Sequence, residues 1–359
     1  MLKEKVVICF LAITIMVGTS ACSKWMQNRA ENEAIVIYPP PPEKPRIQYL
    51  TSISSSLDIT GNRSAFGKFI FGDFDDLEIR KPYGISIFEG KIYICDTGLD
   101  LIEIIDLETN SFEYFIPTGR GQLKKPVNCF VDDQGYLYVA DAERKQVVIF
   151  DSEGKFVHSI GEKDQFKPTD VFIRENKIWV ANIDGNAILI YDKESYDLIG
   201  KFPEAETGNE DFLYSPTNLF VTDSLVYVSD FGDFKIKVYS HDGQFLMSIG
   251  SYGNRIGQFV RPKGIAVDKN ANLYVVDAGF ENTQIFNNEG KLLMYFGGPY
   301  KQHGDMYLPA KVALDYDNPE YFDRYVDDSF ELKYLIYVTN QYGPDKINVY
   351  GFIEEKQER

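Results

Sequence analysis

Short apolar runs separated by turn residues recur along most of the chain. The stretch Arg261–Gly298 contains four such runs, GIAVD, NLYVVD, TQIFN and KLLMYFG, which are rich in Val, Ile, Tyr and Phe. Their length and composition predict β-strands, and the Gly, Asn and Asp residues between them predict short antiparallel connections. Because a four-stranded unit with one apolar face is not stable alone, this stretch predicts further copies of itself that pack against it.

Six copies of this unit can be aligned. Each opens its first strand with a proline: Pro82, Pro126, Pro168, Pro216, Pro262 and Pro309. Each closes its second strand with Asp or Asn: Asp96, Asp141, Asn182, Asp230, Asp277 and Asn340. Proline suits the first residue of a strand, and a short Asx side chain can bond the backbone of the turn that it starts. A spacing of 42 to 48 residues between the prolines excludes leucine-rich, ankyrin and tetratricopeptide arrays and predicts four-stranded blades.

The repeated pattern also resembles a known repeat. P-x-G-I-A-V-D, L-Y-V-x-D and I-x-x-F, followed by E-G-K or D-G-Q and a last strand ending in Ile-Gly or Phe-Gly, resemble the NHL repeat. Residues 121–126 (GQLKKP) and 257–262 (GQFVRP) look like the linkers between blades of that family. The resemblance runs from Arg80 to the C-terminus and implies an all-β, six-bladed β-propeller, in agreement with the six copies.

The sixth copy supplies only three strands, at Lys311–Leu314, Tyr334–Asn340 and Lys346–Phe352. The apolar segment Arg46–Ile53 (RIQYLTSI) has the opposite problem, since no strand precedes it. We therefore expect Arg46–Ile53 to be the outer strand of the last blade, where it closes the ring and covers an otherwise open sheet edge. The predicted propeller spans residues 46–353, and a charged tail follows at 354–359.

The N-terminus is typical of an exported protein. Residues 1–21 contain Lys3 and Lys5, then an apolar run Val6–Val17 that is too short to span a bilayer. Residues 19–22 (TSAC) resemble a bacterial lipobox, which implies that Cys22 is the acylated N-terminus and anchors the chain to a membrane. Ordinary signal cleavage is the alternative.

The residues after the signal predict where the anchored domain would stand. Ser23 follows Cys22, and in Gram-negative lipoproteins a residue other than Asp there implies the outer membrane, on its periplasmic or its outer side. Residues 22–45 include YPPPPEKP at 38–45, which predicts a polyproline spacer between the lipid and the propeller.

The charge of the chain argues against one class of partner, and its cysteines raise the question of a disulfide. The chain has 37 Lys and Arg against 54 Asp and Glu, a formal net charge of −17, which argues against binding nucleic acid. We expect a monomer. Cys95 and Cys129 lie on adjacent copies at small apolar positions, and a disulfide between them stays open at this stage.

The first candidate site is the position two residues after each opening proline, which should form a ring at the channel mouth. The ring consists of Gly84, Asn128, Asp170, Asn218, Gly264 and Lys311. Asn128, Asp170, Asn218 and Lys311 are the candidate ligand-binding residues. The three oxygen-bearing side chains could hold Ca²⁺, as comparable residues do in propeller lactonases of the gluconolactonase type, although the motifs of that family are absent. The alternative is that these residues only hydrate the mouth. No other cofactor is expected.

The histidines indicate no catalytic centre. His158, His241 and His303 fall outside the predicted innermost strands, so the zinc site of amidating lyases and the His-acid cluster of virginiamycin-type lyases cannot be assembled. We assign no catalytic residue.

The second candidate site is the insertion at residues 315–334 in the sixth copy. It is acidic and carries five aromatic residues that could hold a partner: Tyr316, Tyr321, Phe322, Tyr325 and Phe330. A self-packed surface loop is the alternative. Together these features predict an anchored, non-catalytic platform for an envelope protein or a polysaccharide. A metal-dependent hydrolase, lactonase or lyase acting on a small molecule at the channel mouth is the alternative function.

Overall fold

The structure is a computed structural model that describes residues 35–61, 76–161 and 165–356. The predicted signal segment 1–21, the lipidation site Cys22 and residues 23–34 lie outside the described residues. By its contacts the chain divides into Met1–Val36 and Ile37–Arg359, and all elements named below belong to the second unit. No helix within the described ranges has the length and apolar character needed to cross a membrane.

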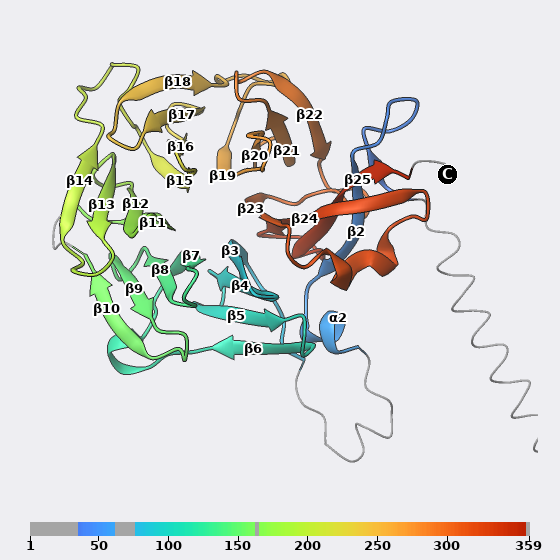
Figure 1. The fold of residues 1–359 in the computed structure, drawn as a ribbon, viewed down its shortest axis with the longest axis horizontal. Helices are drawn as coiled ribbons and strands as arrows, with labels where there is room; N and C mark the ends of the chain where they lie inside the picture. The colour runs from blue at the N-terminus through green and yellow to red at the C-terminus, as the bar shows by residue number, and fades with distance from the viewer. Residues whose placement is uncertain (1–34, 62–75, 162–164, 357–359) are drawn as a thin grey trace, which may run out of the picture. The chain divides into compact units, whose positions relative to one another are not determined.

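Six antiparallel sheets form the blades of a propeller, which confirms the predicted fold class (Figure 1). Blade 1 contains β3 (Pro82–Phe88), β4 (Lys91–Asp96), β5 (Leu101–Asp106) and β6 (Ser111–Phe115). Blade 2 contains β7 (Pro126–Val131), β8 (Leu137–Asp141), β9 (Gln146–Phe150) and β10 (Phe156–Ile160). Blade 3 contains β11 (Pro168–Arg174), β12 (Lys177–Asn182), β13 (Ala187–Asp192) and β14 (Leu198–Phe202).

The remaining three blades complete the ring. Blade 4 contains β15 (Pro216–Val221), β16 (Leu225–Asp230), β17 (Lys235–Ser240) and β18 (Phe245–Ile249). Blade 5 contains β19 (Pro262–Val267), β20 (Leu273–Asp277), β21 (Asn282–Phe286) and β22 (Leu292–Gly297). Blade 6 contains β23 (Pro309–Asp315), β24 (Phe330–Asn340), β25 (Ile347–Glu355), β2 (Ile47–Ile53) and β1 (Ile37–Tyr38). Short helices lie outside the sheets: α2 (Ser56–Thr60), η1 (Gly119–Gly121) and η2 (Pro319–Tyr325).

Every innermost strand begins at one of the opening prolines, as predicted. Because successive strands are antiparallel, the turns between the second and third strands lie at the same end of the propeller as the linkers between blades. We call this end the proline face. The other turns of each blade lie on the opposite face.

The apolar faces of adjacent blades pack against each other. Cys95 and Ile102 of blade 1, for example, belong to one buried cluster with Val139 and Val148 of blade 2. Each fully buried aliphatic side chain contributes about 1.5–3 kcal/mol relative to an exposed one. This packing supplies the partners that a single blade lacks, which is why the sequence must repeat.

The Asp or Asn residue that closes each second strand accepts hydrogen bonds from backbone N–H groups just before the opening proline. Asp96 is buried and accepts hydrogen bonds from Arg80 N–H at 2.6 Å and from Gly98 N–H at 2.7 Å. Asp277 does the same with Val260 N–H and Gly279 N–H, each at 2.7 Å. The structural role expected for these residues is therefore confirmed, and it includes the incoming linker as well as the turn.

The N-terminal strand closes the last blade, as predicted. β2 pairs antiparallel with β25, from Ile47 opposite Phe352 to Ile53 opposite Ile347. The innermost strand of the same blade, β23, lies beside β3 of blade 1 and β19 of blade 5. The first and last parts of the described chain thus share one sheet, and β25 is covered along its edge.

The segment assigned to a proline-rich spacer differs from expectation at its end. Ile37 and Tyr38 form β1, which pairs with Gln48 and Ile47 of β2. Tyr38 Oη donates a hydrogen bond to Gly304 O at 3.0 Å, and its ring lies 6.2 Å from the ring of Phe296. The prolines that follow Tyr38 turn the chain back toward β2, so the propeller sheet begins at Ile37 and not at residue 46. At the other end, β25 runs to Glu355, two residues into the predicted tail.

Candidate site at the channel mouth and the proline face

The predicted ring residues meet at the axis of the propeller. Asn128, Asp170, Asn218 and Lys311 are all buried, on β7, β11, β15 and β23. The ammonium group of Lys311 donates a hydrogen bond to Asp170 Oδ2 and forms an ion pair with it. Because β11 and β23 belong to blades on opposite sides of the ring (Figure 1), this ion pair crosses the channel.

Asp170 has little capacity left for a ligand. In addition to Lys311, its Oδ2 accepts hydrogen bonds from Leu219 N–H at 3.0 Å and from the Asn218 side-chain amide at 3.3 Å, and its Oδ1 accepts one from Val171 N–H at 3.0 Å. The Asn128 amide donates to Thr169 O at 2.6 Å. The side-chain oxygens of Asn128 and Asn218 are buried and have no hydrogen-bond partner among the described residues.

The glycines of the ring allow neighbouring blades to meet. A Cβ atom on Gly84 would lie 2.5 Å from Asn128 Cα, and one on Gly264 would lie 2.4 Å from Lys311 Cα. Such contacts are far below the van der Waals distance, so glycine is required at both positions. These two ring members are therefore structural.

Farther along the channel, aromatic side chains replace polar ones. The ring of Phe172 lies 4.5 Å from that of Phe130 and 4.9 Å from that of Phe220. These residues line an apolar chamber of about 230 Å³ that Lys311 and Tyr316 also border. Lys311 is the one charged side chain among the described residues that line this chamber.

Metal-ligand clusters are absent from the part of the chain that the structure describes. The calcium site expected at Asn128, Asp170 and Asn218 therefore stays a prediction. The histidines contact groups away from the ring: His158 stacks on Tyr196, His241 lies 2.9 Å from Thr222 O through Nε2, and His303 lies 3.1 Å from Asp345 Oδ2 through Nδ1.

The aromatic residues of the 315–334 insertion mostly face the domain. Phe322 lies in η2 and is buried in a cluster that Tyr321 and Tyr325 pack against. Tyr316 contacts the Tyr334 ring at 4.6 Å and lies 4.0 Å below the ammonium of Lys269. Phe330 is the first residue of β24 and is half-buried. Partner binding by this loop stays a prediction, but the geometry matches the self-packed alternative.

Two lysines on the proline face, near the channel mouth, lie against tyrosine rings. The ammonium of Lys263 lies 4.7 Å from the centre of the Tyr83 ring, and that of Lys81 lies 5.2 Å from the centre of the Tyr342 ring. Burial, together with the charges of Arg261 and Lys81, lowers the pKa of Lys263 to about 8. Burial and the nearby Asp170 carboxylate raise the pKa of Tyr83. Tyr83 and Lys263 directly precede the ring residues Gly84 and Gly264, and their contact joins blades 1 and 5 beside the ring.

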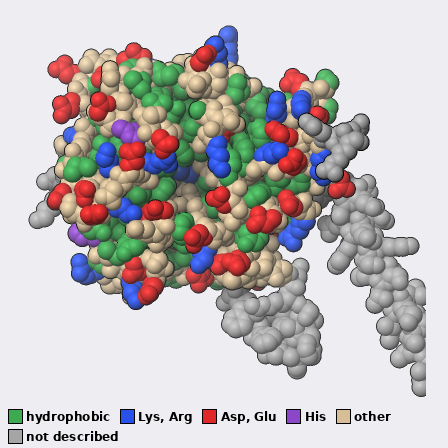
Figure 2. All heavy atoms as spheres, in the orientation of Figure 1, with side chains coloured by type: hydrophobic (Ala, Val, Ile, Leu, Met, Phe, Trp, Pro, Cys, Tyr) green, Lys and Arg blue, Asp and Glu red, His purple; other side chains and the backbone are tan. Residues whose placement is uncertain are grey.

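The sequence carries a signal for these cations at a position outside the predicted ring. The residue directly before the opening proline is basic in four of the six blades: Lys81, Lys125, Lys167 and Arg261. This clustering contrasts with the formal net charge of −17. On the face in view in Figure 2, acidic and basic side chains are interspersed.

Exposed tyrosines lie in the linkers and turns of the same face. Their exposed fractions are 37 % for Tyr214, 68 % for Tyr252, 46 % for Tyr307 and 46 % for Tyr342. Tyr307 contacts Tyr342 with ring centres 6.4 Å apart, and Tyr252 contacts Phe234 at 4.7 Å. We call these four tyrosines the tyrosine arc.

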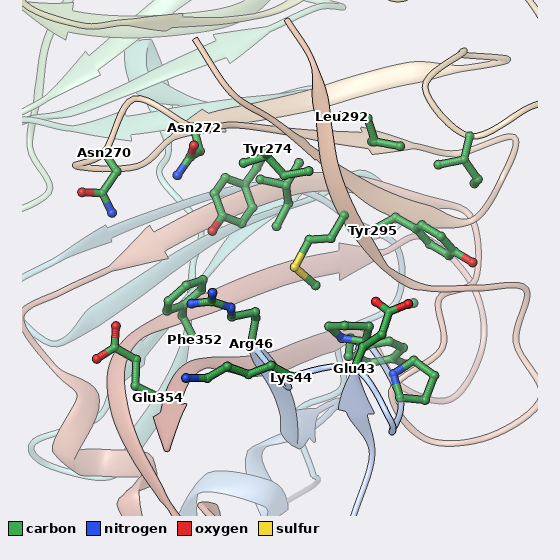
Figure 3. Close-up of a pocket in the computed structure, with 18 residues that line it drawn as sticks. Glu43, Lys44, Arg46, Asn270, Asn272, Tyr274, Leu292, Tyr295, Phe352 and Glu354 are labelled. Carbon is green, nitrogen blue, oxygen red and sulfur yellow. The ribbon is translucent and has the colours of Figure 1, made fainter. Parts of the chain in front are cut away.

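A separate groove of about 1120 Å³ lies between blade 5 and the hairpin of β1 and β2. Figure 3 shows Tyr274, Leu292 and Tyr295 on one side and Lys44 and Arg46 on the other. The groove is at the rim of the propeller and is independent of the channel.

The two described cysteines are free thiols and lie within one buried cluster. Burial and the neighbouring Cys129 raise the pKa of the Cys95 thiol well above its ordinary value. The disulfide left open by the sequence is not formed in the structure.

Comparisons with known proteins bear on the fold. No family model matches the sequence, and no curated protein matches it. A gluconolactonase from Xanthomonas campestris has a TM-score of 0.56 at 13 % identity, over 90 % of this chain and 98 % of that one. A protein of unknown function from Bacteroides thetaiotaomicron has a TM-score of 0.57 at 14 % identity, over 86 % of this chain and 76 % of that one.

A third structural neighbour is a lyase. A catalytically inactive variant of virginiamycin B lyase from Staphylococcus aureus, solved with quinupristin, has a TM-score of 0.53 at 14 % identity, over 76 % of this chain and 95 % of that one. At such low identities these likenesses concern the fold alone. The chain is thus a six-bladed β-propeller whose structural neighbours include enzymes.

Proposed function

We propose that this protein is an envelope-anchored, non-catalytic propeller that holds a protein or polysaccharide partner on its proline face. The tyrosine arc is the observation that carries this proposal. Tyrosine provides a large apolar surface together with a hydroxyl group and is enriched at binding interfaces. Four exposed tyrosines on one face of a rigid scaffold therefore favour partner binding there.

The state of the channel supports a binding role over catalysis. Lys311 and Asp170 are paired across the channel, and Asp170 accepts further hydrogen bonds from Leu219 and Asn218. A catalytic acid or base must reach the proton that it transfers. To do so, the Asp170 carboxylate would have to give up hydrogen bonds from Lys311, Leu219, Asn218 and Val171.

The alternative function is a metal-dependent hydrolase, lactonase or lyase acting on a small molecule at the channel mouth. The gluconolactonase and the virginiamycin B lyase among the structural neighbours favour it. It requires Asn128, Asp170 and Asn218 to bind a cation such as Ca²⁺ in place of Lys311. Millimolar Ca²⁺ should then raise the melting temperature of the protein, and Asp170→Ala should abolish the increase.

Site-specific photo-crosslinking in cells tests the platform. A photoreactive amino acid at Tyr307 or Tyr342 should give one dominant adduct, whereas the same group at Leu246, which is exposed on β18, should not. The combined substitution Tyr307→Ala and Tyr342→Ala should reduce an adduct formed from position 252. Absence of any adduct on the proline face, together with a calcium-dependent increase in melting temperature, would favour the enzyme instead.

A further inference from the structure

Lys263 lies in an electrostatically unfavourable place. It is half-buried at the channel mouth, stacked on the Tyr83 ring. Removal from water and two neighbouring cations, Arg261 and Lys81, act against its charge. A cation that loses hydration without gaining a counter-ion destabilises the folded state.

The described residues supply no counter-ion for this group. None of Lys81, Arg261 and Lys263 forms an ion pair with a carboxylate in residues 35–61, 76–161 and 165–356. Buried Lys237, by contrast, pairs with Asp230 at 3.2 Å. Half-buried Lys263 therefore differs from Lys237 and Lys311, the buried lysines among the described residues, which both pair with a carboxylate.

Four carboxylates of the proline-face turns already have partners. Asp100 pairs with Lys125 at 2.9 Å, and Asp233 pairs with Lys237 at 2.9 Å. Glu281 accepts a hydrogen bond from Leu308 N–H at 2.9 Å, and Asp345 contacts His303 at 3.1 Å. To neutralise the positive charges of Lys81, Arg261 and Lys263, these acidic side chains would have to give up their existing partners.

We infer that Lys81, Arg261 and Lys263 form a binding site for an oxyanion, a carboxylate or phosphate group, at the proline-face mouth of the channel. An oxyanion would be the missing counter-ion. Ammonium and guanidinium groups bind carboxylates and phosphates through short, charge-assisted hydrogen bonds. The anion would bind at the proline-face end of the channel, next to the Lys311–Asp170 ion pair that crosses it.

The oxyanion has two possible sources with the same chemistry, a free small anion or an acidic group on a sugar chain. The exposed ring of Tyr342 beside Lys81 provides an apolar surface for a sugar ring that carries such a group. The inference does not depend on the platform function, because anion binding is measured by itself.

Isothermal titration calorimetry on the full-length protein in detergent micelles tests the site. The probes are inorganic phosphate, oligogalacturonate and, as a neutral control, maltoheptaose. We expect oligogalacturonate or phosphate to bind at low ionic strength, with an affinity that falls as salt screens the charges. Maltoheptaose should bind more weakly than oligogalacturonate. A stronger affinity for oligogalacturonate than for phosphate assigns the anion to a sugar chain, and the reverse assigns it to a small molecule.

Variants show whether the anion occupies the proposed site. Lys263→Gln and Lys81→Gln should each weaken binding about tenfold, while Lys263→Arg should retain it. Lys291→Gln is the matched control, since Lys291 is exposed in the turn between β21 and β22 on the opposite face. The inference is wrong if neither anion binds, or if Lys263→Gln and Lys291→Gln have equal effects. If a partner crosslinks at Tyr342 but no anion binds, the proposed partner binding is supported and only the anion site is wrong.

Discussion

Glu103 on β5 is buried, and among the described residues its carboxyl oxygens have no N–H or hydroxyl donor and face only the carboxyl group of Asp96. Glu103 lies on the third strand of its blade, opposite the residue two positions before the closing Asp96. At the equivalent position, three other blades carry a side chain with a nitrogen donor: Lys237, Gln284 and Asn348. Gln284 Nε2 donates to Gln258 O at 3.0 Å and Asn348 Nδ2 donates to Asp305 O at 2.8 Å. In both blades the accepting carbonyl lies four residues before the opening proline. Burial and the charge of Asp96 raise the pKa of Glu103 well above its ordinary value.

Glu103→Gln should therefore stabilise the protein by about 1–3 kcal/mol, the usual cost of an unsatisfied buried group. The folded state holds the Glu103 proton more tightly than the unfolded chain does, so wild-type stability falls as pH rises above the unfolded pKa of about 4.3. The amide variant lacks this penalty, and its advantage should grow with pH. Thermal melts at pH 5 and pH 8 measure it, with exposed Glu113→Gln as the control. A lower melting temperature for Glu103→Gln at pH 8 would contradict the interpretation.

The ion pair across the channel gives a second residue-scale prediction. Lys311→Met should destabilise the protein by about 3–5 kcal/mol, because it leaves the Asp170 charge buried without its cation. Asp170→Asn in the same chain should recover much of this loss, since a neutral amide needs no counter-ion. Urea unfolding of the single and double variants measures the coupling. Additive effects would mean that the two groups do not interact.

Lys263 makes anion binding depend on pH. Its pKa of about 8 in the free protein reflects burial and the charges of Arg261 and Lys81, while the Tyr83 ring packs below it. Above pH 8 the group loses its proton, so an anion must bind together with a proton and its affinity should fall. Oligogalacturonate titrations at pH 7 and pH 9 should show weaker binding at pH 9, and the difference should shrink in Lys263→Gln. Equal affinity of the wild type at both pH values would remove Lys263 from the site.

At the scale of elements, β2 is the strand on which closure of the ring depends. It pairs with β25 over Ile47–Ile53, and without it β25 would present an open, apolar edge. A chain starting at Ser54 should aggregate or lose its cooperative melt, whereas a chain starting at Ile35 should keep the wild-type melting temperature. Circular dichroism and size-exclusion chromatography distinguish the two. A folded, monomeric chain starting at Ser54 would show that closure is dispensable.

The strands that the sequence predicted best are those whose pattern repeats. Every blade has a proline equivalent to Pro262 and an Asp or Asn equivalent to Asp277, so the sequence predicted the number of blades. β2 could be inferred from the missing strand of blade 6. β1 was not predicted, because the prolines after Tyr38 favoured a spacer, while the contacts that hold Tyr38 are with Gly304 and Phe296, far away in sequence.

The candidate site was predicted only in part, for a local reason. The residues two positions after the prolines meet at the axis, while ligand binding by them stays a prediction. In several blades, however, the strand register shifts directly after the proline, as between Pro168 and Asp170. Such an irregularity re-aims side chains, so Tyr83 and Lys263, one residue after their prolines, also face the mouth. Strict alternation along a strand does not predict that arrangement.

At the scale of the molecule, the distribution of charge sets the proposed binding face apart from the rest of the surface. A net charge of −17 repels anionic surfaces, while the cations beside the opening prolines can attract an anionic ligand to one face. Electrostatic attraction of this kind acts on association rates and is screened by salt. The binding face would therefore be distinguished from the rest of the surface by sign as well as by its tyrosines.

The anchor itself is tested at Cys22, which lies outside the described residues. If Cys22 is acylated, radiolabelled fatty acid should be incorporated into the wild-type protein, and the protein should fractionate with membranes. Cys22→Ser should abolish the label, because acylation requires the thiol, and an exported variant should become soluble. A chain of residues 35–356 fused to an ordinary secretion signal is the matched control, since it keeps the propeller and lacks the cysteine. An unlabelled wild-type protein that fractionates as soluble would instead establish ordinary cleavage, and the platform would then have to reach its partner without a membrane.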